Sequence, residues 1–262
     1  MQVEKLTVHI VGWLKQYALE SKMDGFVIGV SGGVDSAVTS TLCAMTGLKT
    51  LCVEMPIHQG KEQVTRAQEH IASLKKQFTG VTSTQVDLSE LFEGFKTQLP
   101  EISNSDTLRL SLANTRARLR MTTLYYFAGI HKYLVAGTGN KVEDFGVGFY
   151  TKYGDGGVDL SPIADLLKSQ VYTLAKHLKV SKDILEAAPT DGLFGDSRTD
   201  QDQIGASYDE LEWAMKMQEL GKSTGKFSSR EEEVFKIYTR LNKANKHKME
   251  PIPICEIPLE FI

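Results

Sequence analysis

Apolar residues are arranged along this chain in two different patterns. Between residues 3 and 17 they return every three or four positions, which predicts an amphipathic helix. Residues 26–30 form instead a short apolar run with β-branched members, which is typical of a buried strand. Similar strand-like runs follow at 50–55, 81–86 and 133–136, and helical patterns cover 34–47, 61–77, 108–130, 166–178, 182–187, 208–220 and 230–241.

The alternation of strands and helices predicts the fold class. Chains of this kind form α/β folds, in which an open parallel sheet is flanked by helices. Loops are expected at 145–157, which is rich in glycine and aromatic residues, and at 189–204, which is polar. No internal repeat, low-complexity block or linker interrupts the 262 residues, so we expect a single domain over residues 1–262.

Composition excludes several classes of function. The formal net charge of −3 gives no sign of a nucleic-acid surface. Three cysteines without a CxxC pair indicate neither a disulfide framework nor a zinc site. Charges at Glu4, Lys5 and Lys15 argue against a signal peptide, and no run approaches the roughly 20 apolar residues that span a membrane. We therefore expect a cytoplasmic protein that acts on neither nucleic acid nor a membrane.

The strongest local signal is the sequence SGGVDS at 31–36, between a predicted strand and a predicted helix. Glycines there allow close approach of a ligand to the backbone, and several N–H groups can converge on one anion at the helix N-terminus. Neither the GxxxxGK[ST] pattern nor GxGxxG fits this loop. The candidate phosphate-binding residues are Gly29, Ser31, Gly32, Gly33, Asp35 and Ser36, and the carboxylate of Asp35 is also a candidate Mg²⁺ ligand.

A simpler interpretation of this segment is a tight strand-to-helix turn with a serine cap and a first-turn acid. Such a turn needs neither two consecutive glycines nor both hydroxyls, so we favour the phosphate site. The pattern resembles the loop of N-type ATP pyrophosphatases, which cleave ATP between its α and β phosphates. The resemblance implies a Rossmann-like fold of the adenine nucleotide alpha hydrolase type.

Four further segments resemble one family within that group, the NAD synthetases. They read NTRARLRM at 114–121, GTGNKVE at 137–143, TKYGDGGVDL at 151–160 followed by Pro162 and Lys168, and APT at 188–190 followed by Asp200 and GASYDE at 205–210. With the pair His247-Lys248, the resemblance covers residues 26–248. Gly139 departs from the serine that is more usual in the family's motif.

The resemblance implies a role for each matching residue. Thr138, Lys168 and Thr190 would join the glycine loop in binding ATP and pyrophosphate, and Glu143 would be the second Mg²⁺ ligand. Asp155 would act beside Lys168 as a catalytic residue, because it would orient ammonia or accept its proton. The residues that would contact deamido-NAD are Asn114, Arg118, Arg120, Lys152, Asp155, Asp159, His247 and Lys248.

Most of these residues also have a structural interpretation. The arginines of 114–121 would suit a solvated basic face, and Arg118 and Arg120 do not share a helical face. We therefore expect at most one of those two to reach a given phosphate. Glu143 would suit the first turn of a helix, Asp155 an Asp-Gly turn, and His247 an exposed position near the end of the chain.

The family resemblance implies ammonia-dependent NAD synthesis. The carboxylate of deamido-NAD would attack the α-phosphorus of ATP, pyrophosphate would leave, and ammonia would convert the adenylate to NAD and AMP. The chain has no room for the glutaminase domain of larger family members, so free ammonia is expected. We also expect a homodimer, and residues 191–204 and the C-terminal segment ordered over the site.

Two other interpretations of the sequence stay open. One is a different N-type ATP pyrophosphatase amidotransferase, and the other is a non-catalytic nucleotide-binding regulatory protein. The second would keep the glycine loop, but it would need neither Asp155, Glu143 nor Lys168.

Overall fold

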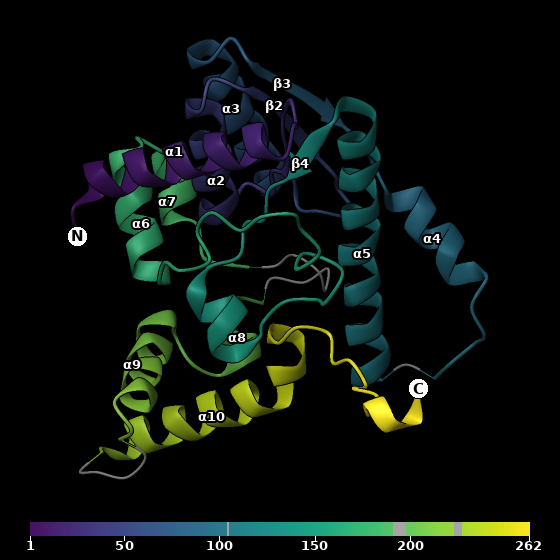
Figure 1. The fold of residues 1–262 in the computed structure, drawn as a ribbon, viewed down its shortest axis with the longest axis vertical. Helices are drawn as coiled ribbons and strands as arrows, with labels where there is room; N and C mark the ends of the chain where they lie inside the picture. The colour runs from purple at the N-terminus through teal and green to yellow at the C-terminus, as the bar shows by residue number, and fades with distance from the viewer. Residues whose placement is uncertain (104, 191–197, 223–226) are drawn as a thin grey trace.

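Four parallel strands form the central sheet of the computed structural model, which describes residues 1–103, 105–190, 198–222 and 227–262. The strands lie in the order β3-β2-β1-β4, and Figure 1 labels β2, β3 and β4. Their bounds are β1 Gly25–Gly29, β2 Lys49–Glu54, β3 Val81–Gln85 and β4 Tyr133–Val135. The open parallel sheet expected from the sequence is confirmed.

Helices follow the strands in the alternating order that the sequence predicts. They are α1 Val3–Glu20, α2 Val34–Met45, α3 Lys61–Gln77, α4 Ser89–Thr97, α5 Asp106–His131, the π-helix η1 Val142–Val147, α6 Lys168–His177, α7 Lys182–Glu186, α8 Asp200–Ile204, α9 Tyr208–Glu219, α10 Ser229–Met249 and the 3₁₀ turn η2 Leu259–Phe261. Among the described residues, no helix is both long and apolar enough to cross a membrane.

Alternate residues of the strands point to opposite faces of the sheet, and helices cover both. Phe26 and Ile28 of β1 pack with α1, α2 and α6, whereas Val27 and Val53 pack with α5 and with Phe92 of α4. Each buried strand thus contributes side chains to two cores, which explains its continuous apolar run. A third core joins η1, α9 and α10 into a layer below the sheet in Figure 1.

The strand order predicts where a ligand site lies, at the carboxyl ends of the strands. From β1 the chain steps to β2 and β3 on one side, whereas β4 pairs with the other side of β1. Open parallel sheets bind ligands at the carboxyl ends of the strands where the order reverses in this way. The SGGVDS loop follows β1 and the GTGNKVE segment follows β4, so both lie at this position.

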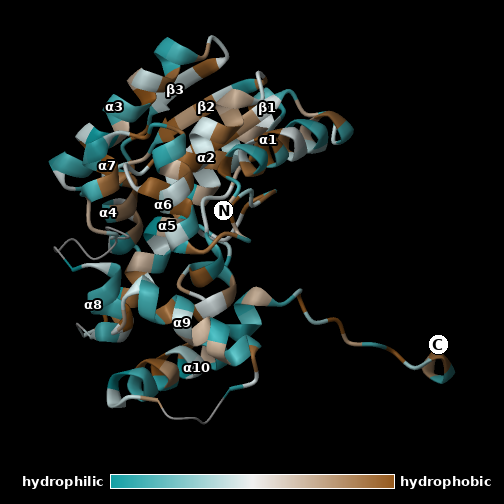
Figure 2. Ribbon diagram, turned by 90° about the vertical axis from the view of Figure 1, so that its left-hand side faces the viewer, coloured by the Kyte–Doolittle hydropathy of each residue, from teal (hydrophilic) through white to brown (hydrophobic). Residues whose placement is uncertain are grey.

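Several elements differ from the sequence-based expectation. Helix α4 was not predicted, α8 occupies the end of the expected loop 189–204, and η1 takes up the start of the expected loop 145–157. Helix α10 continues to Met249 instead of ending at 241, so His247 and Lys248 lie on a helix. Beyond it the chain extends away from the body of the molecule, as Figure 2 shows. Residues 191–197, part of the segment expected to cover the site, lie outside the described residues.

Candidate functional site

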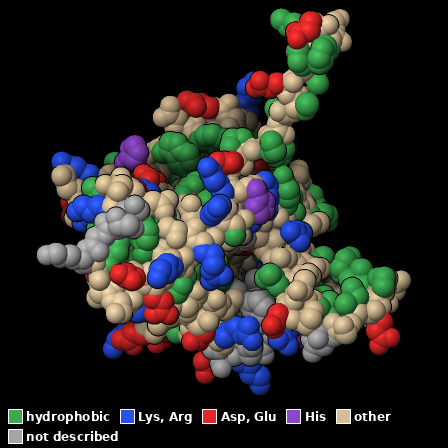
Figure 3. All heavy atoms as spheres, turned by 90° about the horizontal axis from the view of Figure 1, so that it is seen from below, with side chains coloured by type: hydrophobic (Ala, Val, Ile, Leu, Met, Phe, Trp, Pro, Cys, Tyr) green, Lys and Arg blue, Asp and Glu red, His purple; other side chains and the backbone are tan. Residues whose placement is uncertain are grey.

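One pocket at the carboxyl ends of β1 and β4 collects most of the residues singled out from the sequence. Its wall includes loop 31–36, which is the candidate phosphate loop, together with the segment after β4, the start of α6 and the residues before α8. Twelve predicted site residues line it: Gly29, Ser31, Gly32, Gly33, Asp35, Ser36, Arg120, Thr138, Glu143, Asp155, Lys168 and Thr190. Seen from below, several Lys and Arg side chains lie around a hollow near the middle of that face of the molecule (Figure 3).

The phosphate loop has the geometry that its sequence predicts. Gly32 adopts a φ of +81°, and a Cβ at this position would lie 2.5 Å from the backbone oxygen of Gln63 on α3. Only glycine can adopt this positive φ and approach the Gln63 backbone this closely without strain. The hydroxyls of Ser31 and Ser36 lie 3.2 Å apart at the start of α2, and the backbone N–H of Ser31 donates to the Ser36 hydroxyl at 3.2 Å. Both hydroxyls therefore stand where a phosphate would meet the helix N-terminus.

A buried lysine joins the two carboxylates that the sequence assigned to metal binding. Lys168 is the first residue of α6, and its Nζ donates to Oδ2 of Asp35 at 2.6 Å and to Oε1 of Glu143 at 3.0 Å. The Lys168 side chain is only 4% exposed. Burial alone would lower its pKa, but the two carboxylates outweigh that effect and raise the pKa above its ordinary value. Lys168 is therefore protonated, and its charge is shared by Asp35 and Glu143.

Asn140 contacts the carboxylate of Asp35 and the backbone of Glu143. Its side-chain amide donates to Oδ1 of Asp35 at 3.2 Å, while its side-chain oxygen accepts from the backbone N–H groups of Val142 at 3.1 Å and of Glu143 at 3.2 Å. Burial raises the pKa of Asp35, and the charge of Lys168 opposes that rise. Asn140 stands inside the GTGNKVE segment, yet the sequence interpretation gave it no role.

Asp155 also lines the pocket, in the glycine-rich turn after Thr151. Its Oδ1 accepts the backbone N–H of Thr151 at 2.9 Å, and the Thr151 hydroxyl in turn donates to Oδ1 of Asn114 on α5 at 2.7 Å. Burial raises the pKa of Asp155, while the bond from Thr151 opposes the rise. Asn114 therefore supports the turn that carries Asp155, without itself lining the pocket.

Asp144 is an acidic residue of the pocket that the sequence interpretation missed. Burial raises its pKa to about 8, and the charges of Glu143 and Asp155 add to the effect. A Cβ at Gly139 would lie 2.2 Å from Oδ2 of Asp144. A serine at position 139 would therefore require the carboxylate of Asp144 to move.

Tyr208 and Asp200 are two further contacts of the same cluster. The Tyr208 hydroxyl lies 2.6 Å from Oε1 of Glu143 and 2.8 Å from Oδ2 of Asp200. Burial raises the pKa of Tyr208, and the negative charges of Glu143 and Asp200 raise it further. Both residues stand in segments that carried the family resemblance, which was the only signal that could have found them.

The other predicted contacts for deamido-NAD form a network outside the pocket wall. The guanidinium of Arg118 donates to the backbone oxygen of Lys152 at 3.3 Å, and Nζ of Lys152 donates to the backbone oxygen of His247 at 2.8 Å. Lys248 donates to the backbone oxygens of Tyr150, at 2.6 Å, and of Gly148. These side chains tie the end of α10 to the loop that leads into Asp155.

Asp159 and Arg120 make contacts that the sequence did not indicate. The carboxylate of Asp159 accepts from the Tyr125 hydroxyl at 2.9 Å and from the backbone N–H of Val135 at 2.8 Å. It joins α5 to β4 and does not line the pocket. Arg120 lines the pocket and donates to the backbone oxygen of Met55 at 3.0 Å, whereas Arg118 lies outside the wall. The two arginines thus have different surroundings, and the expectation that at most one of them reaches a given phosphate stays a prediction.

The sheet, its strand order and the phosphate loop define a Rossmann-like protein of the adenine nucleotide alpha hydrolase type. The family model described as NAD synthase matches residues 6–252. The chain therefore belongs to the NAD synthase family, and it is an enzyme of the ligase class.

Relatives and solved structures agree with this assignment. The chain is 34% identical over 257 residues to an NH₃-dependent NAD⁺ synthetase of Carboxydothermus hydrogenoformans, with 98% of each chain covered. It is 33% identical over 263 residues to one of Methanosarcina acetivorans, covering 98% of this chain and 100% of that one.

Two solved structures cover the chain almost completely. The NMN synthetase of Francisella tularensis has a TM-score of 0.83 at 29% identity, with 99% of both chains covered. The NH₃-dependent NAD synthetase of Campylobacter jejuni has a TM-score of 0.78 at 25% identity, covering 98% of this chain and 100% of that one.

Proposed function

We propose that this enzyme amidates deamido-NAD with ammonia at the expense of ATP, giving NAD, AMP and pyrophosphate. The observation that carries the proposal is the arrangement of one pocket. A phosphate loop and the Lys168 ammonium lie together in its wall, which Asp155 also lines. An ATP pyrophosphatase that amidates a carboxylate needs both a pyrophosphate site and a group that handles ammonia.

In the first step the backbone N–H groups and hydroxyls of the loop 31–36 bind the β and γ phosphates. Lys168 supplies a compact positive charge beside them. Charge accumulates on the departing pyrophosphate as its bond to the α-phosphorus breaks, and donors fixed in advance stabilise that charge. Thr138 and Thr190, which also line the pocket, supply further hydroxyls.

Asp35 and Glu143 fit a role as ligands of Mg²⁺. Both carboxylates contact one ammonium group, so they are close enough to share a single positive charge. The described residues contain no group of three or more His, Cys, Asp and Glu side chains that could hold a metal by themselves. Mg²⁺ is commonly held by one or two carboxylates together with substrate phosphates, and when bound it would neutralise charge on the polyphosphate.

In the second step Asp155 orients ammonia toward the acyl adenylate or accepts its proton. The bond from Thr151 N–H holds the carboxylate in place during this step. The deamido-NAD molecule would extend from the pocket toward Arg120 and the network of Asn114, Arg118, Lys152, His247 and Lys248. Asp159 would support that site indirectly, because its carboxylate already joins α5 and β4.

The amidation of the mononucleotide counterpart, which would yield NMN, is a second candidate. The observation in its favour is the likeness to the Francisella tularensis NMN synthetase over 99% of both chains. The two reactions share every step at the carboxylate and differ only in the remainder of the substrate. A comparison of kcat/KM for the two acids decides between them.

The direct test combines the protein with ATP, Mg²⁺, ammonium and deamido-NAD, followed by assays of NAD, AMP and pyrophosphate. We expect equal amounts of the three products and none when deamido-NAD is omitted. Asp155→Ala should reduce NAD formation more than it reduces pyrophosphate release. If AMP forms only with a different carboxylate, the proposed substrate is wrong; if ATP binds but is never cleaved, the proposed activity is wrong.

The proposal also includes a homodimer in the cytoplasm. Exposed apolar side chains on α5 and in the segment after α10 support self-association. The cytoplasm is proposed because it supplies ATP, the co-substrate. Measurements of molar mass and of cellular location test these two statements separately.

A further inference from the structure

The hydroxyl of Tyr208 joins two carboxylates from different elements. It lies 2.6 Å from Oε1 of Glu143 on η1 and 2.8 Å from Oδ2 of Asp200 on α8. The ring of Tyr208 also faces the Lys168 ammonium, 4.6 Å from the ring centre. A single side chain thus contacts three of the charged groups that surround the phosphate site.

Tyr208 is held by a rigid helix start. It is the first residue of α9, and the cap residue Ser207 exchanges hydrogen bonds with Glu210. Arg230 of α10 donates to both oxygens of Glu210, at 2.7 and 2.9 Å, and this hydrogen bonding lowers the pKa of Glu210 to about 2. Such a bidentate pair fixes geometry as well as charge. The position of the Tyr208 hydroxyl is therefore set by the packing of α9 on α10.

The two oxygens of Glu143 have different surroundings. Oε1 accepts from both Lys168 and Tyr208, at 3.0 and 2.6 Å. Within the described part of the chain, no hydrogen bond reaches Oε2. Two donors on one oxygen fix the rotation of the carboxylate, and they leave the other oxygen to a ligand in the pocket that Glu143 lines.

We propose that Tyr208 is a positioning residue, whose hydroxyl holds Oε1 of Glu143 so that Oε2 is presented to the divalent cation of the ATP complex. The inference rests on the proposed function only in so far as that function uses a metal–ATP complex. Groups that orient a metal ligand typically contribute 10- to 100-fold to metal affinity. The ring contact with Lys168 is a separate interaction, which phenylalanine would keep.

The variant Tyr208→Phe removes only the hydroxyl. With α,β-methylene-ATP bound, we expect its dissociation constant for Mn²⁺, measured by electron paramagnetic resonance, to rise about tenfold. The affinity for the nucleotide without metal should change less than about twofold. Tyr238→Phe is the matched control, because Tyr238 is a buried tyrosine of the same helical layer, and its Mn²⁺ affinity should equal that of the wild type. Thermal melting confirms that all variants are folded.

A double-mutant cycle with Glu143→Gln separates positioning from a general structural effect. If Tyr208 acts through Glu143, Tyr208→Phe should have little further effect on Mn²⁺ affinity once Glu143 is changed. Unchanged affinity in Tyr208→Phe, an equal loss in the Glu143→Gln background, or absence of Mn²⁺ binding in the wild type would each overturn the proposal. The experiment contains neither deamido-NAD nor ammonia. The Mn²⁺ measurements can therefore be interpreted even if the proposed amidation proves wrong.

Discussion

Lys168 and a divalent cation would compete for the negative charge of Asp35. Oδ1 of Asp35 accepts from Asn140, and Oδ2 accepts from the Lys168 ammonium at 2.6 Å. A metal that binds Asp35 directly would place its charge beside the Lys168 ammonium and repel it, and the ammonium has another partner at hand once ATP phosphates arrive. The geometry therefore makes metal and ATP binding interdependent.

The variant Lys168→Met tests this competition. Without its ammonium, Asp35 and Glu143 repel each other in a buried site, so a divalent cation should bind them even without ATP. We expect Mn²⁺ alone to raise the melting temperature of the variant and to leave that of the wild type nearly unchanged. Turnover should fall by about 10²–10³, because the charge beside the pyrophosphate is lost. An equal Mn²⁺ shift in both proteins would contradict the competition.

His70 makes stability depend on pH for a simple reason. It is buried between α3 and α2, where its Nε2 lies 2.9 Å from the Ser40 hydroxyl. Burial lowers its pKa to about 4 from the ordinary 6.5, because the charged imidazolium loses its hydration. Between these two values the unfolded chain binds a proton that the folded chain does not. The stability from His70 is therefore complete above pH 6.5 and is lost as the pH falls toward 4.

The variant His70→Gln measures that contribution. At pH 7.5 it should be less stable than the wild type, and the difference should shrink by about 3 kcal/mol as the pH falls to 4. Urea unfolding at several pH values gives the two curves. His9→Gln, at an exposed position of α1, is the control and should stay parallel to the wild type. A difference between His70→Gln and the wild type that does not depend on pH would show that the histidine titrates normally.

At the scale of elements, the end of α10 shows why its last turns escaped prediction. Asn242 donates to the backbone oxygen of Gly146 at 2.6 Å, Asn245 to that of Val147 at 2.8 Å, and Lys248 to that of Gly148. Polar side chains at a spacing of three residues thus satisfy successive carbonyls at the end of η1. This contact leaves no apolar pattern, so apolar periodicity stopped at residue 241.

Other elements were missed for related physical reasons. Helix α4 has nine residues and buries only Phe92, so its apolar signal is weak. Helix α8 has five residues, too few to show a period. The π-helix η1 has no period that an α-helical or strand pattern would match. Strands β1, β2 and β4 were predictable because they are short, mostly buried apolar runs, whereas β3 buries only Val81.

Three side chains of α10, Asn242, Asn245 and Lys248, donate to successive backbone oxygens at the end of η1, and we call these hydrogen bonds the ladder. The ladder predicts a specific loss of stability. Asn245→Ala would leave the backbone oxygen of Val147 without its donor, which costs about 1–3 kcal/mol for a group shielded from water. Lys243→Ala, on the exposed side of the same helix, should change stability by less than about 0.5 kcal/mol. Urea unfolding of both variants provides the comparison. Equal effects would mean that helix propensity, and not the ladder, determines stability here.

At the scale of the whole molecule, the sequence could locate the site but not its internal contacts. The SGGVDS loop and the GTGNKVE segment each follow a strand, and in the structure both contribute to one pocket at the carboxyl ends of β1 and β4. Lys168 stands 133 positions from Asp35, so only the family resemblance pointed to it. The bonds of Asn140 and Tyr208 depend on side-chain rotamers and helix packing, which no local pattern encodes.

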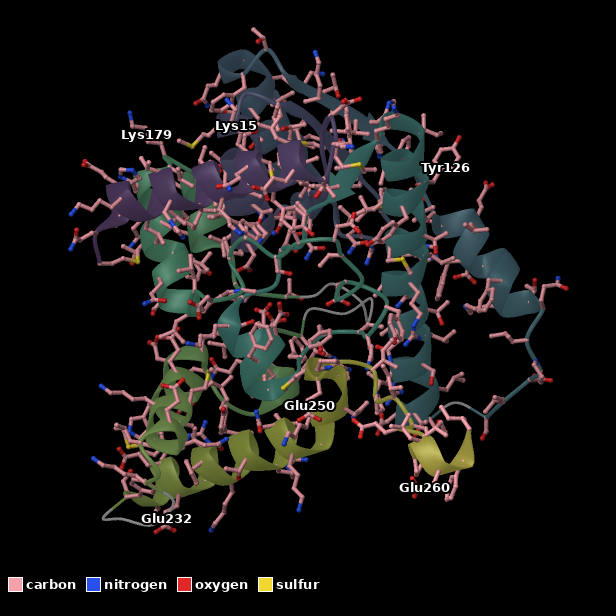
Figure 4. All side chains as sticks on the ribbon, viewed as in Figure 1. Lys15, Tyr126, Lys179, Glu232, Glu250 and Glu260 are labelled. Carbon is pink, nitrogen blue, oxygen red and sulfur yellow. The ribbon has the colours of Figure 1, made fainter. Side chains whose placement is uncertain are left out.

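The outer face of α5 and the segment after α10 expose several large apolar side chains. On α5 these include Tyr126 and Ile130, which are four residues apart and so share one side of the helix, and Figure 4 shows Tyr126 directed away from the body of the molecule. In the C-terminal segment Ile254 is 85% exposed and Phe261 is 76% exposed. Exposed apolar groups gathered on one part of a surface favour association, and a second copy of the chain would cover them at the proposed dimer interface.

The double variant Tyr126→Glu/Ile130→Glu tests the α5 face. In a two-fold symmetric dimer both changes occur twice, so four carboxylates would be brought together and desolvated. We expect light scattering after size exclusion to give a dimer for the wild type and a monomer for this variant. Val8→Glu, on the exposed side of α1, should remain dimeric. A monomeric wild type would refute the dimer, whereas a dimeric double variant would place the interface on another face, with the C-terminal segment the next to change.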